Sequence, residues 1–343
     1  TCTSGREALY RFCEEHRITH ERCGKVVVAV DETELPALEE LQRRGAANGL
    51  DGMQWLDRQG VREHEPNVNG VAGLHVPQTG IVDYVGVTRK MAEIAASRGT
   101  TLHLGTPITG ITTSKEGCRI DSGQRSFEAK YLVNCAGLHS DRLARLAGAR
   151  PELKIIPFRG EYYLFRPEQR EKVKNLIYPV PDPEMPFLGV HFTRMFSGEV
   201  EAGPNAVLAW KREGYKRSDI SLHDLYDTFS YPGFWRLAAR FWKVGLYEYG
   251  RSFSKRLFLR SLQRLIPEVD SPDLEPGGSG VRAQAVDRDG RLVDDFRIIA
   301  GQNAVHVLNA PSPAATASLA IGHHIADEIT KIMHHPEGQE DKE

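Results

Sequence analysis

The chain has 343 residues, and its 44 Lys and Arg against 46 Asp and Glu give a formal net charge of −2. A general nucleic-acid-binding surface is strongly basic, so this balance argues against nucleic acid as a partner. Hydrophobic residues make up 40% of the chain, which is ordinary globular usage, and no stretch approaches the ~20 consecutive apolar residues of a membrane-spanning helix. At about 150 residues per domain, the length predicts about two domains.

Five cysteines occur, an odd number, and no CxxC pair is among them. This usage predicts reduced thiols in a cytoplasmic protein and neither a disulfide scaffold nor a zinc site, so no metal site is expected. The chain starts with Thr1-Cys-Thr3, without Met or a signal-peptide pattern. We therefore expect a fragment whose N-terminal segment is missing.

Helical and strand periodicities alternate through the first 150 residues. In the first helix, Leu9, Phe12, Cys13 and His16 share one face. The pattern predicts helices at 5–16, 35–44, 84–97 and 140–146, and strands at 25–30, 101–104, 108–113 and 131–136, with a loop-rich stretch at 55–80. Such alternation is typical of α/β or α+β structure.

From residue 151 to about 279 prolines cluster, strands are short and aromatic residues are frequent. We predict a mainly antiparallel sheet with a helical insertion at 218–265. Asp289-Gly290 lies between apolar runs and predicts a hairpin turn. A strand at 305–309, a turn at 311–313, a helix at 314–332 and a frayed tail at 333–343 complete the chain.

One strand–turn–helix run, Asn134-Cys-Ala-Gly-Leu138 followed by Ser140-Asp141, is built from small residues at the turn. The N-terminus of a helix attracts anions and electron-rich ring edges, and small side chains let a planar ligand approach the backbone. The alternative is a tight turn without a ligand.

A second such run, at 309–322, is almost free of large side chains. Ser312 suits an N-cap and Pro313 the first helical position. This helix either packs closely on another helix through Ala and Gly or begins close to a flat ligand.

Four ionisable side chains lie in or beside apolar strand patterns: Arg159, His191, Arg194 and Arg282. A buried guanidinium needs a partner, and arginine binds carboxylates bidentately. Histidine is the natural base for a hydroxyl at neutral pH. The alternatives are a salt bridge for each arginine and a structural role for the histidine.

The runs at 157–162, 176–194, 203–209, 280–285 and 309–316 resemble the L-2-hydroxyglutarate oxidase/dehydrogenase family of the FAD-dependent D-amino-acid-oxidase superfamily. The resemblance extends over nearly the whole chain, from residue 5 to 332. It implies α/β plus α+β architecture, with an FAD-binding dinucleotide-type domain and a substrate domain with a mixed or antiparallel sheet. The implied boundaries are 1–22, 81–150 and 283–332 for the FAD domain, and 23–80 and 151–282 for the substrate domain.

The resemblance also implies which residues bind FAD. Asn134 to Gly137 match a cofactor strand, Ile108 matches a position near the adenine, and the turn after Asn309 matches the helix start that faces the flavin. The expected FAD-binding residues are Ile108, Cys135, Ala136, Gly137, Pro311, Ser312, Pro313, Ala314 and Ala315.

The dinucleotide fingerprint GxGxxG, which opens such folds, does not occur in the 343 residues. The glycine-rich run at 277–280 lies between a proline and a strand, so it does not fit the fingerprint. We expect the missing element to precede Thr1, the first βαβ unit to be incomplete, and this segment alone to bind FAD weakly and to be inactive.

The implied reaction is oxidation of L-2-hydroxyglutarate, a small 2-hydroxy diacid, to 2-oxoglutarate by hydride transfer to flavin N5. Arg282 is expected to bind the C1 carboxylate because it precedes the C-terminal cofactor segment, and Arg159 and Arg194 the distal carboxylate. His191 is the first choice as base and His75 the second. The alternatives are a related flavin enzyme acting on an amine or glycerol 3-phosphate, and a truncated non-catalytic diacid-binding module.

Residues 233–262 contain seven basic residues, one acid and many interleaved aromatics. This composition suits a helix lying on a membrane surface, which would reach a quinone as electron acceptor; oxygen is the other acceptor considered. The protein would then be cytoplasmic and peripheral on the inner face of a membrane. The alternative is a solvated helix whose aromatic side chains are core.

Overall fold

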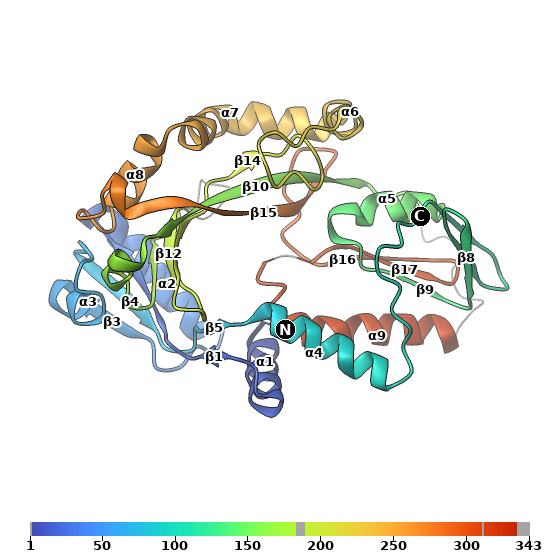
Figure 1. The fold of residues 1–343 in the computed structure, drawn as a ribbon, viewed down its shortest axis with the longest axis horizontal. Helices are drawn as coiled ribbons and strands as arrows, with labels where there is room; N and C mark the ends of the chain where they lie inside the picture. Colours follow the sequence, from blue (N-terminus) through green and yellow to red (C-terminus); the bar gives the residue numbers. More distant parts are fainter. Residues whose placement is uncertain (1, 183–188, 311, 335–343) are drawn as a thin grey trace.

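The structure is a computed structural model that describes residues 2–182, 189–310 and 312–334. Figure 1 shows a lobe built on one large sheet beside a lobe of smaller sheets, with the strand pair β10 and β15 extending between them. The helices are α1 (Cys2–His16), α2 (Leu35–Ala47), α3 (Arg58–His64), α4 (Tyr84–Ser97), α5 (Ser140–Leu146), α6 (Leu222–Phe229), α7 (Pro232–Phe253), α8 (Lys255–Gln263) and α9 (Ser318–His334).

The large sheet has the strand order β14-β10-β13-β12-β11-β2-β4-β3, and β15 pairs with β10. Its strands are β2 (Lys25–Ala29), β3 (Gln54–Asp57), β4 (Ala72–Val76), β10 (Leu153–Phe165), β11 (Leu176–Pro179), β12 (His191–Arg194), β13 (Val200–Gly203), β14 (Val207–Leu208) and β15 (Leu274–Asp287). All the pairings are antiparallel except that of β11 with β2.

Alternation of side chains gives the centre of this sheet two different faces. The core face carries Val26, Ile177, Phe192 and Ala202, which are buried in the main hydrophobic cluster together with Phe258 of α8. The residues between them in sequence point the other way. We call that side the cavity face; it carries Lys25, Tyr178, His191, Thr193 and Glu201.

The second lobe contains the sheet β16-β17-β9 and the antiparallel meander β6-β7-β8. The strands are β6 (Gly110–Thr113), β7 (Cys118–Ser122), β8 (Arg125–Ala129), β9 (Leu132–Asn134), β16 (Arg297–Gly301) and β17 (Ala304–Asn309), and a short pair β1 (His20–Glu21) and β5 (Ile81–Val82) lies beside α1. All six residues of β17 are buried, so this strand is the centre of the lobe.

The predicted α/β plus α+β class is confirmed, and the helical insertion forms as α6, α7 and α8. The strand expected at 101–104 is absent, because that segment is a loop in which Leu102 is 50% and Leu104 88% exposed. Apolar alternation there has no partner strand to pack against.

Candidate active site

The two small-residue turns meet at one edge of a sheet. β9 and β17 are parallel neighbours, with Leu132 beside Ala304 and Asn134 beside His306. Their carboxyl ends therefore point to the same edge, which is where open α/β sheets bind ligands. The predicted cofactor residues Cys135, Ala136 and Gly137 follow the first strand. Ser312, Pro313, Ala314 and Ala315 follow the second, and Pro311 lies outside the described residues.

The side chain of Asn134 holds the first turn through two hydrogen bonds. This side chain is buried; the amide nitrogen donates to the Ser140 carbonyl oxygen at 2.8 Å, and the amide oxygen accepts from the Ala136 N–H at 3.1 Å. Gly137 has a φ of +54°, and no atom lies within 4 Å of where its Cβ would be. An exposed, small-residue backbone at a strand end fits the flat ring system of FAD.

The second turn packs on a helix and also borders a cavity. A Cβ on Gly5 of α1 would lie 2.6 Å from Ala317 Cα, so small residues are needed for this helix contact. Pro313 and Thr316 line the cavity, and Thr316 shares a 3.1 Å hydrogen bond with the Tyr84 hydroxyl. The helix-packing interpretation of the small-residue run is confirmed, and the run also borders a cavity. Ile108 lies in the loop before β6.

This cavity of about 620 Å³ lies between the cavity face of the large sheet and the elements α1, β5 and α4. Its volume is in the range of small-molecule sites. The sheet contributes Lys25, Leu176, Tyr178, Thr193 and Glu201, and the following segment contributes Arg194, Met195 and Phe196.

Three side chains on adjacent strands form a row on the cavity face. The rings of Tyr178 and His191 are stacked, with centroids 4.2 Å apart, and the Lys25 ammonium lies 5.1 Å from the centre of the Tyr178 ring. His191 Nδ1 lies 3.1 Å from the Gly189 carbonyl oxygen. A carbonyl only accepts, so Nδ1 carries the proton, and Nε2 of the neutral ring is an acceptor.

Burial is the largest influence on the pKa of each of these three side chains. It lowers the pKa of His191 to about 4, an effect that the Gly189 hydrogen bond opposes and the Lys25 charge reinforces. Burial also lowers the pKa of Lys25 and raises that of Tyr178. His191 is therefore uncharged at neutral pH and able to accept a proton.

The charge of Arg282 acts on Tyr162, which is also influenced by Tyr178 of this row. Burial raises the pKa of the Tyr162 hydroxyl, the charge of Glu201 and the neighbouring Tyr178 raise it further, and the charge of Arg282 lowers it. Arg282 is exposed on β15. The charge of Arg282 therefore reaches Tyr162, which is itself influenced by Tyr178 and Glu201 of the cavity face.

The other predicted substrate residues have different surroundings. Arg159 is 5% exposed, and its guanidinium donates to Glu161 at 3.1 Å and to the carbonyl oxygens of Gly214 and Lys216. His75 pairs with Val26 on the core face and stacks on His64, with centroids 4.3 Å apart.

Arg194 lines the cavity, but its Nε and Nη2 already have protein partners. The guanidinium binds Glu21 at 2.7 Å, the Lys174 carbonyl oxygen at 2.7 Å and the Asn175 side chain at 3.3 Å. These contacts hold the end of β12 against β1 and against the residues just before β11.

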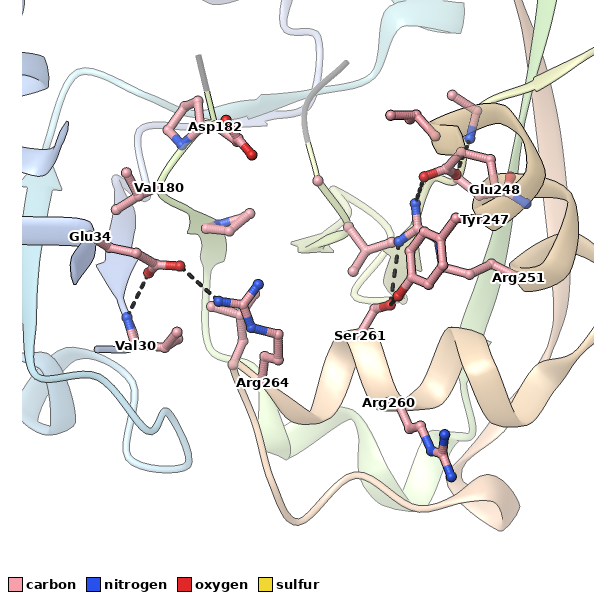
Figure 2. A pocket seen from close by; sticks show the side chains of 18 of the residues that line it. Val30, Glu34, Val180, Asp182, Tyr247, Glu248, Arg251, Arg260, Ser261 and Arg264 are labelled. Atoms are coloured by element: carbon pink, nitrogen blue, oxygen red, sulfur yellow. Dashed lines mark hydrogen bonds and ion pairs between the residues drawn. The ribbon is translucent and has the colours of Figure 1, made fainter. Parts of the chain in front are cut away.

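A larger cavity of about 940 Å³ lies near α7 and α8, next to Asp182 and Gly189 (Figure 2). Its two glutamates are already engaged: Glu34 pairs with Arg264 at 2.8 Å, and Glu248 pairs with Arg251 and accepts from the Ala206 N–H. Its described lining residues include none from the two small-residue turns, whereas the smaller cavity includes Pro313 and Thr316, so the smaller cavity is the candidate active site.

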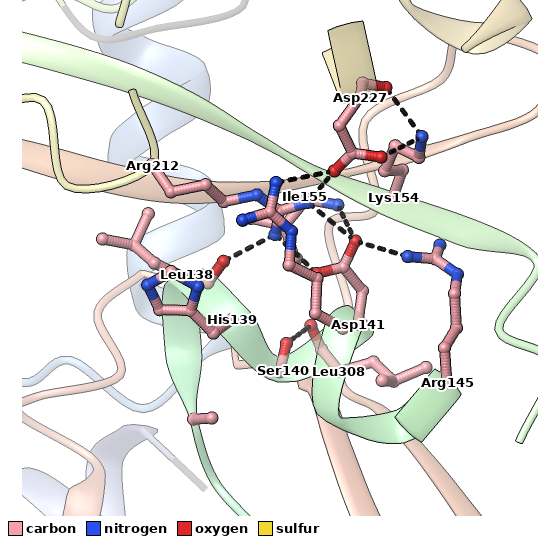
Figure 3. Close-up of polar contacts among 12 residues, drawn as sticks. Leu138, His139, Ser140, Asp141, Arg145, Lys154, Ile155, Arg212, Asp227 and Leu308 are labelled. Atoms are coloured by element: carbon pink, nitrogen blue, oxygen red, sulfur yellow. Dashed lines mark hydrogen bonds and ion pairs between the residues drawn. The ribbon is translucent and has the colours of Figure 1, made fainter. Parts of the chain in front are cut away.

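Two features escaped the sequence analysis. Lys25 directly precedes the buried run Val26-Val-Val-Ala29. It is a cation beside an apolar strand, which is the same pattern that identified the arginines as candidates. The other is the buried ion pair between Arg212 and Asp141, at 2.5 Å (Figure 3). Arg212 also donates to the Leu138 carbonyl oxygen at 2.6 Å, directly after the first cofactor turn. No local pattern marks a pair 71 residues apart.

Comparison with known proteins gives consistent matches. The family model described as FAD dependent oxidoreductase matches residues 2–328. L-2-hydroxyglutarate dehydrogenase of Indibacter alkaliphilus is 52% identical over 94% of this chain and 81% of its own length. The Escherichia coli K12 protein of the same name is 42% identical, over 97% and 79%.

Among solved structures, the FAD-bound L-α-glycerophosphate oxidase of Mycoplasma pneumoniae superposes with a TM-score of 0.72. It is 21% identical in sequence, and the match covers 91% of this chain and 74% of that one. At this identity the similarity establishes the shared fold.

Proposed function

This chain belongs to the family of FAD dependent oxidoreductases, and from that premise we propose that it oxidises L-2-hydroxyglutarate to 2-oxoglutarate. Relatives at 40–52% identity over most of the chain carry the name of that dehydrogenase. The observation that carries the proposal is a cavity lined by Lys25 and Tyr178, with the neutral ring of His191 stacked on Tyr178 and the charge of Arg282 acting on the nearby Tyr162. A cofactor turn, through Pro313 and Thr316, borders that cavity.

The residues that would hold FAD are those at the shared edge of β9 and β17: Cys135, Ala136, Gly137, Ser312, Pro313, Ala314 and Ala315. FAD, when bound, supplies the acceptor for the hydride that leaves the substrate Cα. The role of the chain is to bind the diacid, orient its Cα–H and accept the hydroxyl proton.

Arg282 binds the C1 carboxylate in this proposal, because a guanidinium matches the two oxygens of a carboxylate. His191 accepts the hydroxyl proton at Nε2, which its hydrogen bond to Gly189 leaves unprotonated. The C2–O bond becomes a double bond as the hydroxyl proton and the Cα hydride leave. The two electrons of the oxidation depart with the hydride.

The test is turnover by the full-length protein supplied with FAD, using an artificial dye as electron acceptor. We expect 2-oxoglutarate from L-2-hydroxyglutarate and no comparable turnover of glycine, glycerol 3-phosphate or the D enantiomer. A preference for the amine or the phosphate ester would instead favour the related flavin enzymes. Binding of the diacid without any reduction would favour a non-catalytic module.

For the electron acceptor we propose a membrane quinone, reached through α7. The large apolar side chains of this helix divide between two sides: Phe234 is buried, whereas Trp235, Trp242 and Leu246 are 55–64% exposed. These three recur at helical spacing, and Arg236 and Arg240 lie exposed among them. We call this set the α7 outer face.

An exposed apolar stripe flanked by cations is the pattern of a helix that lies in a membrane interface. Figure 1 places α7 along the outer edge of the molecule, above β10 and β15. Within the described residues no helix has the length and hydrophobicity to span a bilayer. The proposed contact is therefore peripheral.

A further inference from the structure

We propose that Lys25 binds the second carboxylate of the substrate and thereby selects diacids over monoacids. This inference rests on the proposed function, because it concerns the same cavity. Its starting point is a lysine at the first position of a buried strand, facing the cavity rather than the core.

Burial of the charged Lys25 ammonium is unfavourable in free energy. The ammonium makes no hydrogen bond or ion pair with any residue in the described part of the chain, and it lies over the Tyr178 ring. Burial lowers its pKa, and no carboxylate of the described residues acts on that pKa in the opposite direction. An unpaired buried cation is destabilising, and a cavity that keeps one is suited to an anionic ligand.

The other cations considered for this carboxylate are occupied. Arg159 is enclosed by Glu161 and two backbone carbonyls, and Arg194 is held by Glu21, Asn175 and the Lys174 carbonyl. A substrate carboxylate would have to displace a protein partner at Arg159, and at Arg194 it would have to share the guanidinium with Glu21. At Lys25 it would replace nothing.

The order of the strands matches the order of groups in the substrate. Across the sheet, Lys25 is on β2, Tyr178 on β11, His191 on β12 and Arg282 on β15, beyond β13 and β10. The strand of the base thus lies between the strands of the two cations. Three strand spacings, about 14 Å, separate His191 from Arg282, so the long Arg282 side chain would have to extend toward His191 to bind a carboxylate one bond from C2. Two strand spacings separate Lys25 from His191, about 10 Å, which three carbons and a hydrogen bond at each end can bridge.

The interaction predicts a specific pattern of substrate discrimination. L-2-Hydroxypentanoate has the same five carbons and carries a methyl group where L-2-hydroxyglutarate carries its distal carboxylate. If Lys25 binds that carboxylate, replacing Lys25 weakens binding of the diacid and leaves binding of the monoacid unchanged. Arg282 and His191 act on the half that both substrates share.

The experiment compares Lys25→Met with the unaltered full-length protein, loaded with FAD, on both substrates. We expect KM for L-2-hydroxyglutarate to rise at least tenfold with a smaller change in kcat, while KM for L-2-hydroxypentanoate stays within twofold. Calorimetry should show the same loss for 2-oxoglutarate binding and none for 2-oxopentanoate. Lys25→Arg should recover part of the difference.

Lys255→Met is the matched control, because the Lys255 ammonium also lies over a tyrosine, 5.7 Å from the ring of Tyr163, but donates to the carbonyl oxygens of Ser271 and Leu274. It should leave the ratio of the two KM values unchanged. An equal effect of Lys25→Met on both substrates would overturn the inference while leaving the proposed function intact. No oxidation of either substrate by the unaltered protein would instead overturn the proposed function.

Discussion

In its proposed role as the base, His191 has one nitrogen, Nε2, that can accept a proton. Its Nδ1 donates to the Gly189 carbonyl oxygen, and its ring is stacked on Tyr178, so the imidazole is fixed in both tautomer and orientation. Burial, opposed by the Gly189 bond and aided by Lys25, lowers its pKa to about 4. The neutral base is therefore present throughout the physiological range, and protonation would remove it only in acid.

At this scale we expect kcat/KM of the FAD-loaded enzyme to rise with pH through an apparent pKa near 4 and to be level from about pH 6 to 8. Replacement His191→Asn should lower kcat by about 10²–10⁴-fold, with a modest change in KM, and should abolish the acidic limb. The measurement is a pH profile of initial rates for both proteins. An unchanged acidic limb in the variant would assign the base elsewhere.

At the scale of elements, a buried ionic network joins α5 to the large sheet and to the helical insertion. Asp141 is fully buried and binds Arg212, Arg145 and the Ile155 N–H (Figure 3). Arg212 adds Asp227 of α6 and the Leu138 carbonyl oxygen. Burial by itself would raise the pKa of Asp141, but the hydrogen bonds and charge of Arg212 outweigh it and lower the pKa.

We expect Arg212→Met to cost about 3–5 kcal/mol of unfolding free energy, because it leaves the Asp141 carboxylate buried without its main partner. Arg145→Met removes a partner whose side chain is 38% exposed and should cost at most about 1 kcal/mol. Urea unfolding of the two variants measures the difference. Equal costs would show that the network does not depend on Arg212.

The same variant tests the link between this network and the cofactor turn. Since Arg212 holds the Leu138 carbonyl directly after Gly137, Arg212→Met should weaken FAD binding more than Arg145→Met does. Titration of each apoprotein with FAD, followed by flavin fluorescence under native conditions, gives the two affinities. Equal affinities would restrict Arg212 to a structural role.

At the scale of the whole molecule, the active site and the α7 outer face belong to different surfaces. The cavity lies between the large sheet and α1, whereas α7 lies on the opposite side of β10 and β15 (Figure 1). A molecule resting on a bilayer through α7 would leave the cavity open to dissolved diacid. Substrate entry and membrane attachment would then not compete.

We expect the protein to float with vesicles containing anionic lipid and to be released by high salt, since each basic residue near such a surface contributes about 1 kcal/mol. Replacing Trp235 and Trp242 by Ser should abolish flotation and reduction of a vesicle-bound quinone. Turnover with a soluble dye should not change. Ala239→Ser is the matched control on the same face, and flotation of the double Trp variant would contradict the proposal.

The sequence by itself determined the local units: the strand–turn–helix runs at Asn134 and Asn309, the helical insertion, the family, and the set of cations near apolar strands. These follow from spacing between near neighbours, which the chain carries locally. Alternation also shows that adjacent residues of a strand face opposite ways.

Only the tertiary structure decided which of the two faces looks into the cavity. His75 and His191 both belong to strands of the large sheet, yet His75 lies on the core face and His191 on the cavity face. Arg159 binds Glu161 and two carbonyl oxygens, whereas the contact that the described residues offer the Lys25 ammonium is the Tyr178 ring. The physical reason is that a side chain's partners come from strands and loops distant in sequence, so their charge is known only once the sheet is assembled.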